Sequence, residues 1–151
     1  MIYQESQFSE NARSWAGAYG IMQMMPQTMR RFSIDSSSSI KEQINAGIKY
    51  IKWLDRQFKD KIEDPEERKK FILASYNVGL AHVMDAMRLA DKYGKDPTQW
   101  NGNVAYYLRQ KSKPEFYQDS VVKYGYARGE EPFKYVNQIY ERYQHYQNII
   151  D

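Results

Sequence analysis

The chain has 151 residues, the usual size of a single domain, and we expect one compact domain over residues 1–151. It contains no cysteine, which excludes disulfides, thiolate catalysis, zinc fingers and iron–sulfur clusters. The formal net charge is +3, from 22 basic and 19 acidic residues, and only mildly favours anionic partners. His82 and His145 are the only histidines and lie far apart, so we expect no metal and no cofactor.

The hydropathy of the sequence argues against a membrane span. Its mean value is -0.84. No apolar run approaches the roughly 20 residues that cross a bilayer. The first residues also lack the basic and apolar regions of a signal peptide.

The strongest helical signal begins behind a serine-rich loop at residues 36–39. Ser39 and Glu42 have the spacing of a capping box. Behind them, apolar residues recur at spacings of three and four. This stripe is Ile40, Ile44, Ile48, Ile51, Leu54, Phe58 and Ile62.

Further helices follow along the chain. Asp64 and Pro65 form the start of a helix that ends near Gly79, and the next helix ends near Gly94. No segment alternates at a period of two, so we predict a mainly α-helical domain. The remaining segments are predicted as a loop at 94–103, a short helix at 103–110, an irregular stretch at 124–129 and a long amphipathic helix at 131–150.

Tyrosine is unusually frequent, with 14 residues in a chain that is 15% aromatic. A tyrosine ring has a flat apolar face and a polar tip, which suits a core beside a wet groove or stacking on sugars or bases. The alternative is that these tyrosines pack a helical core with their hydroxyls at its rim.

Because the motifs of other common catalytic sites are absent, catalysis by a carboxyl group is the option that remains. The sequence has no phosphate-binding loop, dinucleotide fingerprint, nucleophile elbow or H-E-x-x-H motif. A carboxyl becomes a general acid when apolar and uncharged neighbours raise its pKa. Glu5 has Ile2, Phe8 and Trp15 nearby in sequence. A lone glutamate is usually exposed, so Glu5 stands out only through the motifs around it.

Four motifs occur in order along the chain: residues 5–8 (E-S-Q-F), 17–26 (G-A-Y-G-I-M-Q-M-M-P), 75–79 (S-Y-N-V-G) and 135–136 (Y-V). This set resembles the soluble-lytic-transglycosylase-like family. The resemblance implies a lysozyme-like helical domain with short helices around a saccharide-binding cleft, acting on the glycan strands of bacterial peptidoglycan. Residues 124–131 resemble its membrane-bound lytic murein transglycosylase F branch, where the catalytic domain follows a domain similar to periplasmic solute-binding proteins.

The resemblance also assigns roles to single residues. It places the catalytic glutamate at Glu5, which would protonate the glycosidic oxygen and then act as a base. Ser75 stands where the family usually has alanine. The substrate-binding positions fall on Ser14 beside the reacting sugar, Gln23 and Met25 in the groove, Tyr76 and Asn77 in the A-Y-N pair, and Tyr135 near the carboxylate.

Neighbouring residues of the second motif have ordinary structural explanations. Met22, Met24 and Met29 are predicted to fill the core, because methionine adapts to irregular gaps. Gly17 and Gly20 either let the backbone turn tightly beside the sugar or allow close helix packing.

The family uses one glutamate, and the C6 hydroxyl of the muramic acid attacks C1 to give a 1,6-anhydro product. No second carboxylate stands in the motifs, which agrees with this mechanism although many glycosidases use two. Three alternatives remain open: a goose-type lysozyme-like hydrolase, a non-catalytic peptidoglycan-binding module, and a nucleic-acid-binding domain suggested by basic residues among the tyrosines of 106–146.

A catalytic residue at position 5 leads us to expect further chain before it in a parent protein. The resemblance implies a place on the periplasmic side of the bacterial envelope, associated with the outer membrane through parts outside this sequence. We expect a monomer whose partner is the peptidoglycan glycan strand, and no nucleic acid.

Overall fold

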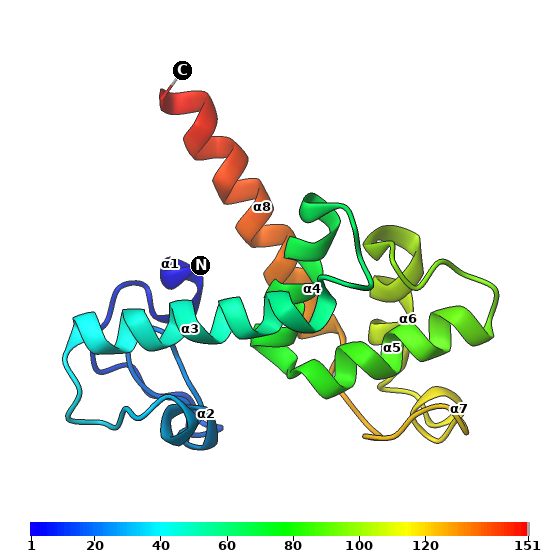
Figure 1. Cartoon of the computed structure of the whole chain (residues 1–151), viewed down its shortest axis with the longest axis horizontal. Coiled ribbons are helices and arrows are strands. Elements are labelled where there is room, and N and C mark those ends of the chain that lie inside the picture. Colours follow the sequence, from blue (N-terminus) through cyan, green and yellow to red (C-terminus); the bar gives the residue numbers. More distant parts are fainter. Residues whose placement is uncertain (151) are drawn as a thin grey trace. The chain divides into compact units, whose positions relative to one another are not determined.

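The computed structural model describes residues 1–150 and is mainly α-helical, as predicted. The described residues form two compact units, the first comprising Met1–Trp53 and the second beginning at Leu54. The prediction of one domain over residues 1–151 stays a prediction. The helices are α1 (Ile2–Ser6), α2 (Pro26–Arg31), α3 (Ile40–Phe58), α4 (Pro65–Val78), α5 (Leu80–Lys92), α6 (Ala105–Gln110), α7 (Pro114–Tyr117) and α8 (Glu130–Ile150), with a wide turn, η1, at Trp100–Val104 (Figure 1).

Helix α3 begins with the predicted capping box. The backbone nitrogen of Ser39 donates to Glu42 Oε2 at 2.7 Å, and the backbone nitrogen of Glu42 donates to Ser39 Oγ at 3.3 Å. The reciprocal bonds satisfy amides that have no partner within the helix. The predicted apolar stripe is partly wrong, because Ile48 is 44% exposed.

The first unit has its core where α3 meets the irregular segment of residues 7–25. Gly47 on α3 lies directly against Met22, and a Cβ atom added at position 47 would lie only 2.3 Å from Met22 Cε. The buried face of this part of α3 is therefore small and partly polar, and consists of Gln43, Ala46 and Gly47. Arg31 of α2 stacks over the Trp53 ring at 4.0 Å, which joins α2 to α3.

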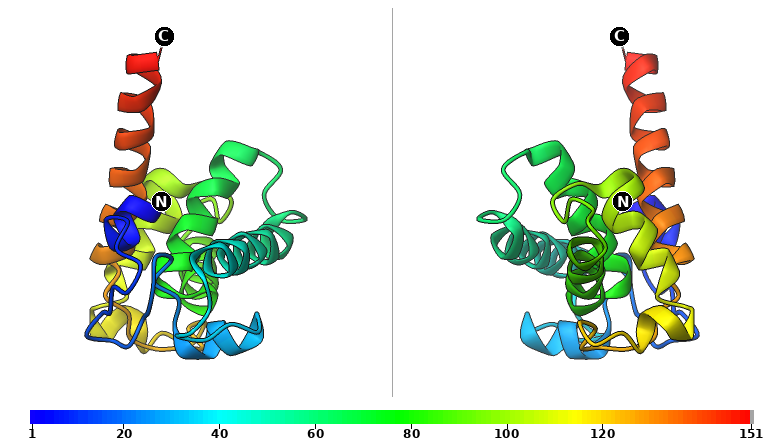
Figure 2. Two further views of the ribbon diagram at one scale, coloured as in Figure 1. Left: turned by 90° about the vertical axis from the view of Figure 1, so that its left-hand side faces the viewer. Right: turned by 90° about the vertical axis from the view of Figure 1, so that its right-hand side faces the viewer.

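The second unit is built on α4, α5, α6 and α8. Asp64 caps α4 as predicted, its carboxylate accepting from the backbone nitrogen of Glu66 at 2.8 Å, and Pro65 follows at the first helical position. α4 and α8 pack against each other and run antiparallel (Figures 1 and 2). The Tyr140 hydroxyl on α8 donates to the Glu66 carbonyl at 3.1 Å, so the start of α4 meets the middle of α8.

An aromatic column forms the centre of the second unit. Phe71 of α4 contacts Phe58 of α3 and Trp100 of η1, with ring centroids 5.6 Å and 5.4 Å apart. All three side chains are fully buried. Tilted and edge-to-face pairs of this kind add to the stabilisation from burial alone.

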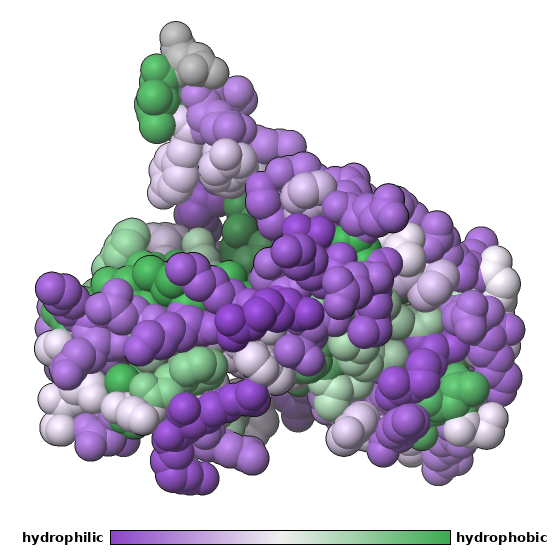
Figure 3. Space-filling model, viewed as in Figure 1, coloured by the Kyte–Doolittle hydropathy of each residue, from purple (hydrophilic) through white to green (hydrophobic). Residues whose placement is uncertain are grey.

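Several tyrosines lie at the surface. The sequence also allowed the alternative that the tyrosines pack the core with their hydroxyls at its rim, and these exposed tyrosines do not fit it. Tyr107 and Tyr135 are buried, whereas the exposed set includes Tyr93, Tyr106, Tyr124, Tyr126, Tyr143 and Tyr146. The end of α8 also exposes Ile149 and Ile150 and shows green in Figure 3.

No helix within residues 1–150 combines the length and apolar character needed to cross a membrane. In the same residues, no three histidine, aspartate or glutamate side chains gather in a way that could hold a metal ion.

Candidate active site

Glu5 lies in the last turn of the five-residue helix α1 and is half-buried. The chain reverses immediately after it, because Gln7 and Phe8 both adopt positive φ angles of 52° and 64°. Ser6 fixes the helix in place: its buried hydroxyl donates to the Ile21 carbonyl at 2.8 Å. The serine of the E-S motif therefore attaches the helix of Glu5 to the segment that carries Gln23.

This segment, residues 17–25, is held in shape by a glycine and a buried amide. Gly20 has φ 82°, and a Cβ on it would lie 2.0 Å from Gln43 Oε1. That same oxygen accepts from the Ile21 backbone nitrogen at 3.1 Å. Gly20 thus provides a tight turn and allows the close approach of α3, while a place for this turn beside the sugar stays a prediction.

Replacing Gly20 by alanine should therefore destabilise the first unit by about 2–5 kcal/mol, from left-handed backbone strain and displacement of Gln43. Gly17 is the matched control, because its φ is 92° but a Cβ would meet nothing within 4 Å. Gly17→Ala should cost only the strain, about 1–2 kcal/mol. Urea unfolding measures both, and equal losses would show that the contact with Gln43 is unimportant.

Gln23 continues this arrangement with a left-handed backbone of its own, at φ 46°. Its Nε2 atom donates to the carbonyls of Ala12 at 2.9 Å and Gly20 at 2.8 Å. A primary amide has two N–H donors and an oxygen acceptor. With both donors used inside the protein, the oxygen is the group of Gln23 that suits a hydroxyl or amide of a ligand.

The methionines in and beside the second motif differ in burial. Met22, Met24 and Met29 are buried at 3%, 3% and 6% exposure, which confirms their prediction as core residues. Met25 is 44% exposed and precedes Pro26 at the start of α2. Its side chain is thus on the surface, where a groove residue must be.

Ser14 is engaged in a local turn. Its Oγ accepts from the Ala18 backbone nitrogen at 2.9 Å, and its carbonyl accepts from the Gly17 nitrogen at 3.1 Å. An oxygen has a second lone pair and a serine hydroxyl a proton, so this bond leaves Ser14 able to contact a sugar. The role of Ser14 beside the reacting sugar stays a prediction.

The third motif forms the end of α4 in the second unit. Tyr76 is half-buried and Asn77 is exposed, and α4 ends after Val78 at Gly79, whose φ is 98°. Ser75 is fully buried, and its hydroxyl has no hydrogen-bond partner among the described residues. A buried hydroxyl without a hydrogen-bond partner has a desolvation cost, so Ser75 makes this helix end less stable than an apolar side chain of similar size would.

Tyr135 lies on α8, the helix that packs antiparallel to α4, and is 5% exposed. Its neighbours Pro132 and Val136 are buried as well, so this part of α8 faces the core of the second unit. The predicted site residues divide between the units, with Glu5, Ser14, Gln23 and Met25 in the first and Tyr76, Asn77 and Tyr135 in the second. Their convergence on Glu5 stays a prediction.

Comparison with known proteins identifies the family. Residues 1–99 match the model of the transglycosylase SLT domain, and this match contains the first three motifs. The chain belongs to the transglycosylase SLT domain family. Membership agrees with the mainly α-helical fold described above.

Proteins named membrane-bound lytic murein transglycosylase F are similar over almost the whole chain. The protein from Desulfosudis oleivorans is 39% identical over 95% of this chain. Those from Mannheimia succiniciproducens and Haemophilus influenzae strain PittGG are 40% and 39% identical over 92% of it. This SLT-domain chain spans 31%, 28% and 28% of the lengths of these three relatives.

Sequence reasoning missed three buried polar residues. Gln43 lies three residues after Ile40, so its place at an apolar position of α3 was a usable signal. Asp85 is likewise surrounded by the apolar residues of α5, whereas nothing in the sequence near Lys111 indicates that its side chain is fully buried.

Proposed function

We propose that this chain is the catalytic domain of a peptidoglycan lytic transglycosylase, with Glu5 as its only catalytic carboxyl group. The observation that carries the proposal is the attachment of the Glu5 helix, through Ser6, to the segment that presents Gln23 and Met25. Membership of the SLT family and the names of the relatives support it.

The proposed reaction breaks the bond between C1 of N-acetylmuramic acid and O4 of N-acetylglucosamine. Protonated Glu5 gives its proton to O4, which leaves as a hydroxyl group. The C6 hydroxyl oxygen of the same muramic acid forms the new bond to C1, and the Glu5 carboxylate takes the hydroxyl proton. One carboxyl thus serves as acid and then as base and ends in its starting state.

The remaining predicted residues bind the sugar in this proposal. Gln23 offers its amide oxygen and Met25 an exposed apolar surface, and Ser14 and Asn77 offer polar groups. Tyr76 and Tyr135 belong to the packed helices α4 and α8, which give them fixed positions. A groove with apolar faces and a few placed polar groups suits a neutral sugar ring.

We also propose that the domain works as a monomer on glycan strands at the periplasmic side of the bacterial envelope. Association with the outer membrane would come from other parts of a longer protein. The words "membrane-bound" and "murein" in the names of the relatives support this placement.

Product analysis tests the proposed reaction. The purified chain, or a longer parent protein, should release muropeptides that end in 1,6-anhydro-muramic acid from peptidoglycan. Such products lack the water that hydrolysis adds, so mass spectrometry separates the two reactions by the mass of one water molecule. A digest in which every product carries the added water identifies a lysozyme-like hydrolase and contradicts the transglycosylase mechanism.

A further inference from the structure

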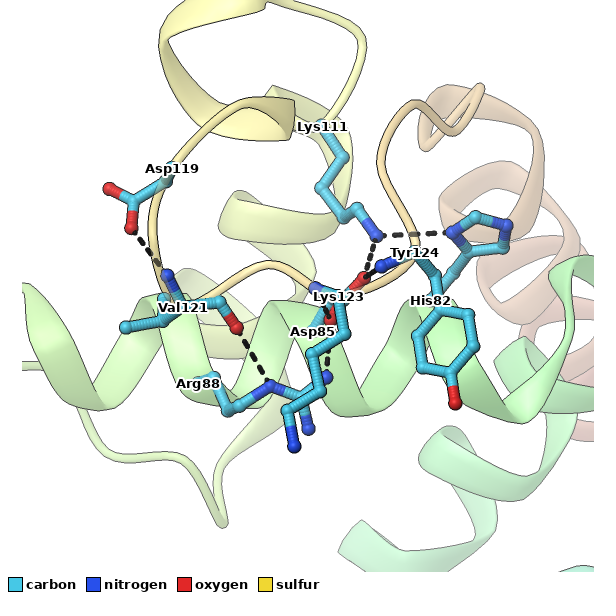
Figure 4. A network of polar contacts seen from close by, with 8 residues as sticks. All are labelled: His82, Asp85, Arg88, Lys111, Asp119, Val121, Lys123 and Tyr124. Atoms are coloured by element: carbon cyan, nitrogen blue, oxygen red, sulfur yellow. Dashed lines mark hydrogen bonds and ion pairs between the residues drawn. The ribbon is translucent and has the colours of Figure 1, made fainter.

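Residues 119–127, here called the strap, connect α7 to α8 without forming a regular helix. Segments of this kind are usually among the more mobile parts of a protein. The strap is instead held by side chains from one face of α5. These are Asp85, Arg88 and Lys92, which have the spacing of residues on one side of a helix. Asp85 and Arg88 are drawn in Figure 4.

Asp85 is the main holding residue. Its carboxylate accepts from the backbone nitrogens of Lys123 at 2.8 Å and Tyr124 at 2.9 Å. It also accepts from Arg88, and Arg88 Nε donates to the Val121 carbonyl at 2.9 Å. The strap backbone between Val121 and Tyr124 is therefore bonded at three positions to two side chains of α5.

Further contacts fix both ends of the strap. At its start, Asp119 accepts from Lys92 Nζ at 2.7 Å and from the Tyr93 hydroxyl at 3.0 Å. At its end, the Ala127 backbone nitrogen donates to the Lys111 carbonyl at 3.2 Å. The start of the strap is thus connected to the end of α5, and its end to the residue that follows α6.

The charges that support the strap are buried. Asp85 and Lys111 both have fully buried side chains and form an ion pair at 2.6 Å, and Lys111 Nζ also lies 3.0 Å from His82 Nδ1. Burial alone would raise the pKa of Asp85, but Lys111, the two strap amides and Arg88 together lower it. The carboxylate is thus kept charged, at the desolvation cost that burying two ions carries.

The strap presents two exposed aromatic side chains. Tyr124 is 60% exposed and Tyr126 is 53% exposed, and the Tyr126 ring meets the Tyr117 ring edge-on at 5.9 Å. The backbone nitrogen of Tyr124 faces Asp85 while its ring points away from the carboxylate (Figure 4). A fixed backbone that carries exposed aromatic rings reduces the entropy lost when a ligand stacks on them.

We propose that the strap is a prebuilt stacking surface, on which Tyr124 and Tyr126 bind sugar rings of the glycan strand while Asp85 and Arg88 act as positioning residues. This inference rests on the proposed function for the identity of the ligand. A tyrosine ring suits the flat C–H face of a sugar, and its hydroxyl suits the surrounding polar groups.

The strap lies in a part of the chain that is similar to the membrane-bound lytic murein transglycosylase F proteins but lies outside the match to the SLT-domain model. The strap lies beyond residues 1–99, which the SLT-domain model matches. The similarity to the membrane-bound lytic murein transglycosylase F proteins, in contrast, covers 92–95% of the chain. The charge of the strap also suits peptidoglycan. The muramic acids of peptidoglycan carry peptides with free carboxylates. On the strap, the positive charge of Lys123 is exposed, whereas the negative charge of Asp119 is paired with Lys92.

Binding to insoluble peptidoglycan sacculi tests the proposal, in a Glu5→Gln background that avoids cleavage. Tyr124→Ala and Tyr126→Ala should each weaken binding by about 2- to 10-fold in a cosedimentation assay, as expected for single aromatic contacts. Tyr143→Ala is the matched control, because Tyr143 is 59% exposed but lies on α8. It should leave binding unchanged.

Arg88→Lys tests positioning. Lysine keeps a cation beside Asp85 but loses the Nε–H bond to Val121, so the Tyr124→Ala effect should be smaller in this background. If the binding losses of Arg88→Lys and Tyr124→Ala were fully additive, the positioning role of Arg88 would be overturned. Three results would overturn the stacking surface. The first is that Tyr124→Ala and Tyr126→Ala bind sacculi as tightly as the parent Glu5→Gln chain. The others are that Tyr143→Ala weakens binding equally, or that the Glu5→Gln chain does not bind sacculi at all.

Turnover by the wild-type chain is measured separately on the same sacculi. Strap-dependent binding without anhydro products would support the strap and contradict the proposed activity. Anhydro products with unchanged binding in the tyrosine variants would support the activity and contradict the strap.

Discussion

Glu5→Gln should lower the turnover of peptidoglycan by at least about 10²–10⁴-fold, the contribution that general acid–base catalysis makes. Glutamine keeps the shape of the side chain but cannot transfer the proton. The fold should survive, because Glu5 is half-buried and the bond from Ser6 to Ile21 does not involve it. Release of soluble muropeptides measures the turnover, and circular dichroism with thermal unfolding measures the fold.

Glu10→Gln is the matched control for this prediction. Glu10 lies in the same unit and is exposed, so the substitution removes the same charge and should leave turnover close to wild type. If Glu5→Gln kept more than about a tenth of the activity, outside the range expected for a lost general acid, another acid would have to carry the reaction.

Most helices that the sequence predicted have a local signal, such as a cap, a glycine stop or a recurring hydrophobic period. The capping box of Ser39 and Glu42, the N-cap at Asp64 and the stop at Gly79 act through neighbouring residues, and the structure confirms them. Helices α1, α2 and α7 have only 5, 6 and 4 residues, too few for a hydrophobic period to appear. Their positions depend on tertiary contacts, although proline at the first position of α2 and α7 was a usable signal.

The candidate site divides in the same way. The burial of Met22 was predicted from the usual role of methionine as core filler, and the structure confirms it. Met25 was assigned to the groove by resemblance alone; it is exposed, and its groove role stays a prediction. The anchor from Ser6 to Ile21 joins residues 15 positions apart, and no period or cap encodes such a contact. The exposed Ile48 shows the same limit, since contacts at Gln43 and Gly47 decide which face of α3 is buried.

Asp85→Asn should destabilise the second unit by about 3–5 kcal/mol, the cost of leaving a buried charge without its partner. Without the carboxylate, the fully buried Lys111 loses its ion pair and keeps the contact with His82 Nδ1, which supplies no compensating negative charge. Lys111→Met should cost less, about 1–3 kcal/mol, because Asp85 keeps Arg88 and two backbone amides. Urea unfolding of both variants measures which substitution lowers the free energy of unfolding more.

An ion pair on the surface provides the control for this comparison of stability losses. Lys69→Met removes an exposed ion pair with Glu66 and should change stability by less than about 1 kcal/mol. A loss for Lys111→Met equal to that for Asp85→Asn would contradict the argument, since it would mean that the strap amides and Arg88 do not support the carboxylate.

The same network should make the wild-type chain less stable in acid, in two steps. The pKa of His82 is lowered by burial and by Lys111, so below about 6.5 the unfolded chain binds a proton that the native chain does not, and stability falls. The pKa of Asp85 is lowered below 3.8, because the ion pair and hydrogen bonds outweigh its burial. Its contribution is complete above that value and is lost as the pH falls through the native pKa. The pKa values of Asp35, Glu42, Asp96 and Asp119 are also lowered, chiefly by hydrogen bonds that their carboxylates accept, so both the wild type and Asp85→Asn should lose some stability in this acid range. The loss should be smaller in Asp85→Asn than in the wild type. Thermal unfolding midpoints measured between about pH 7 and pH 2 would contradict the assignment to Asp85 if both proteins lost stability in parallel over the lower part of that range.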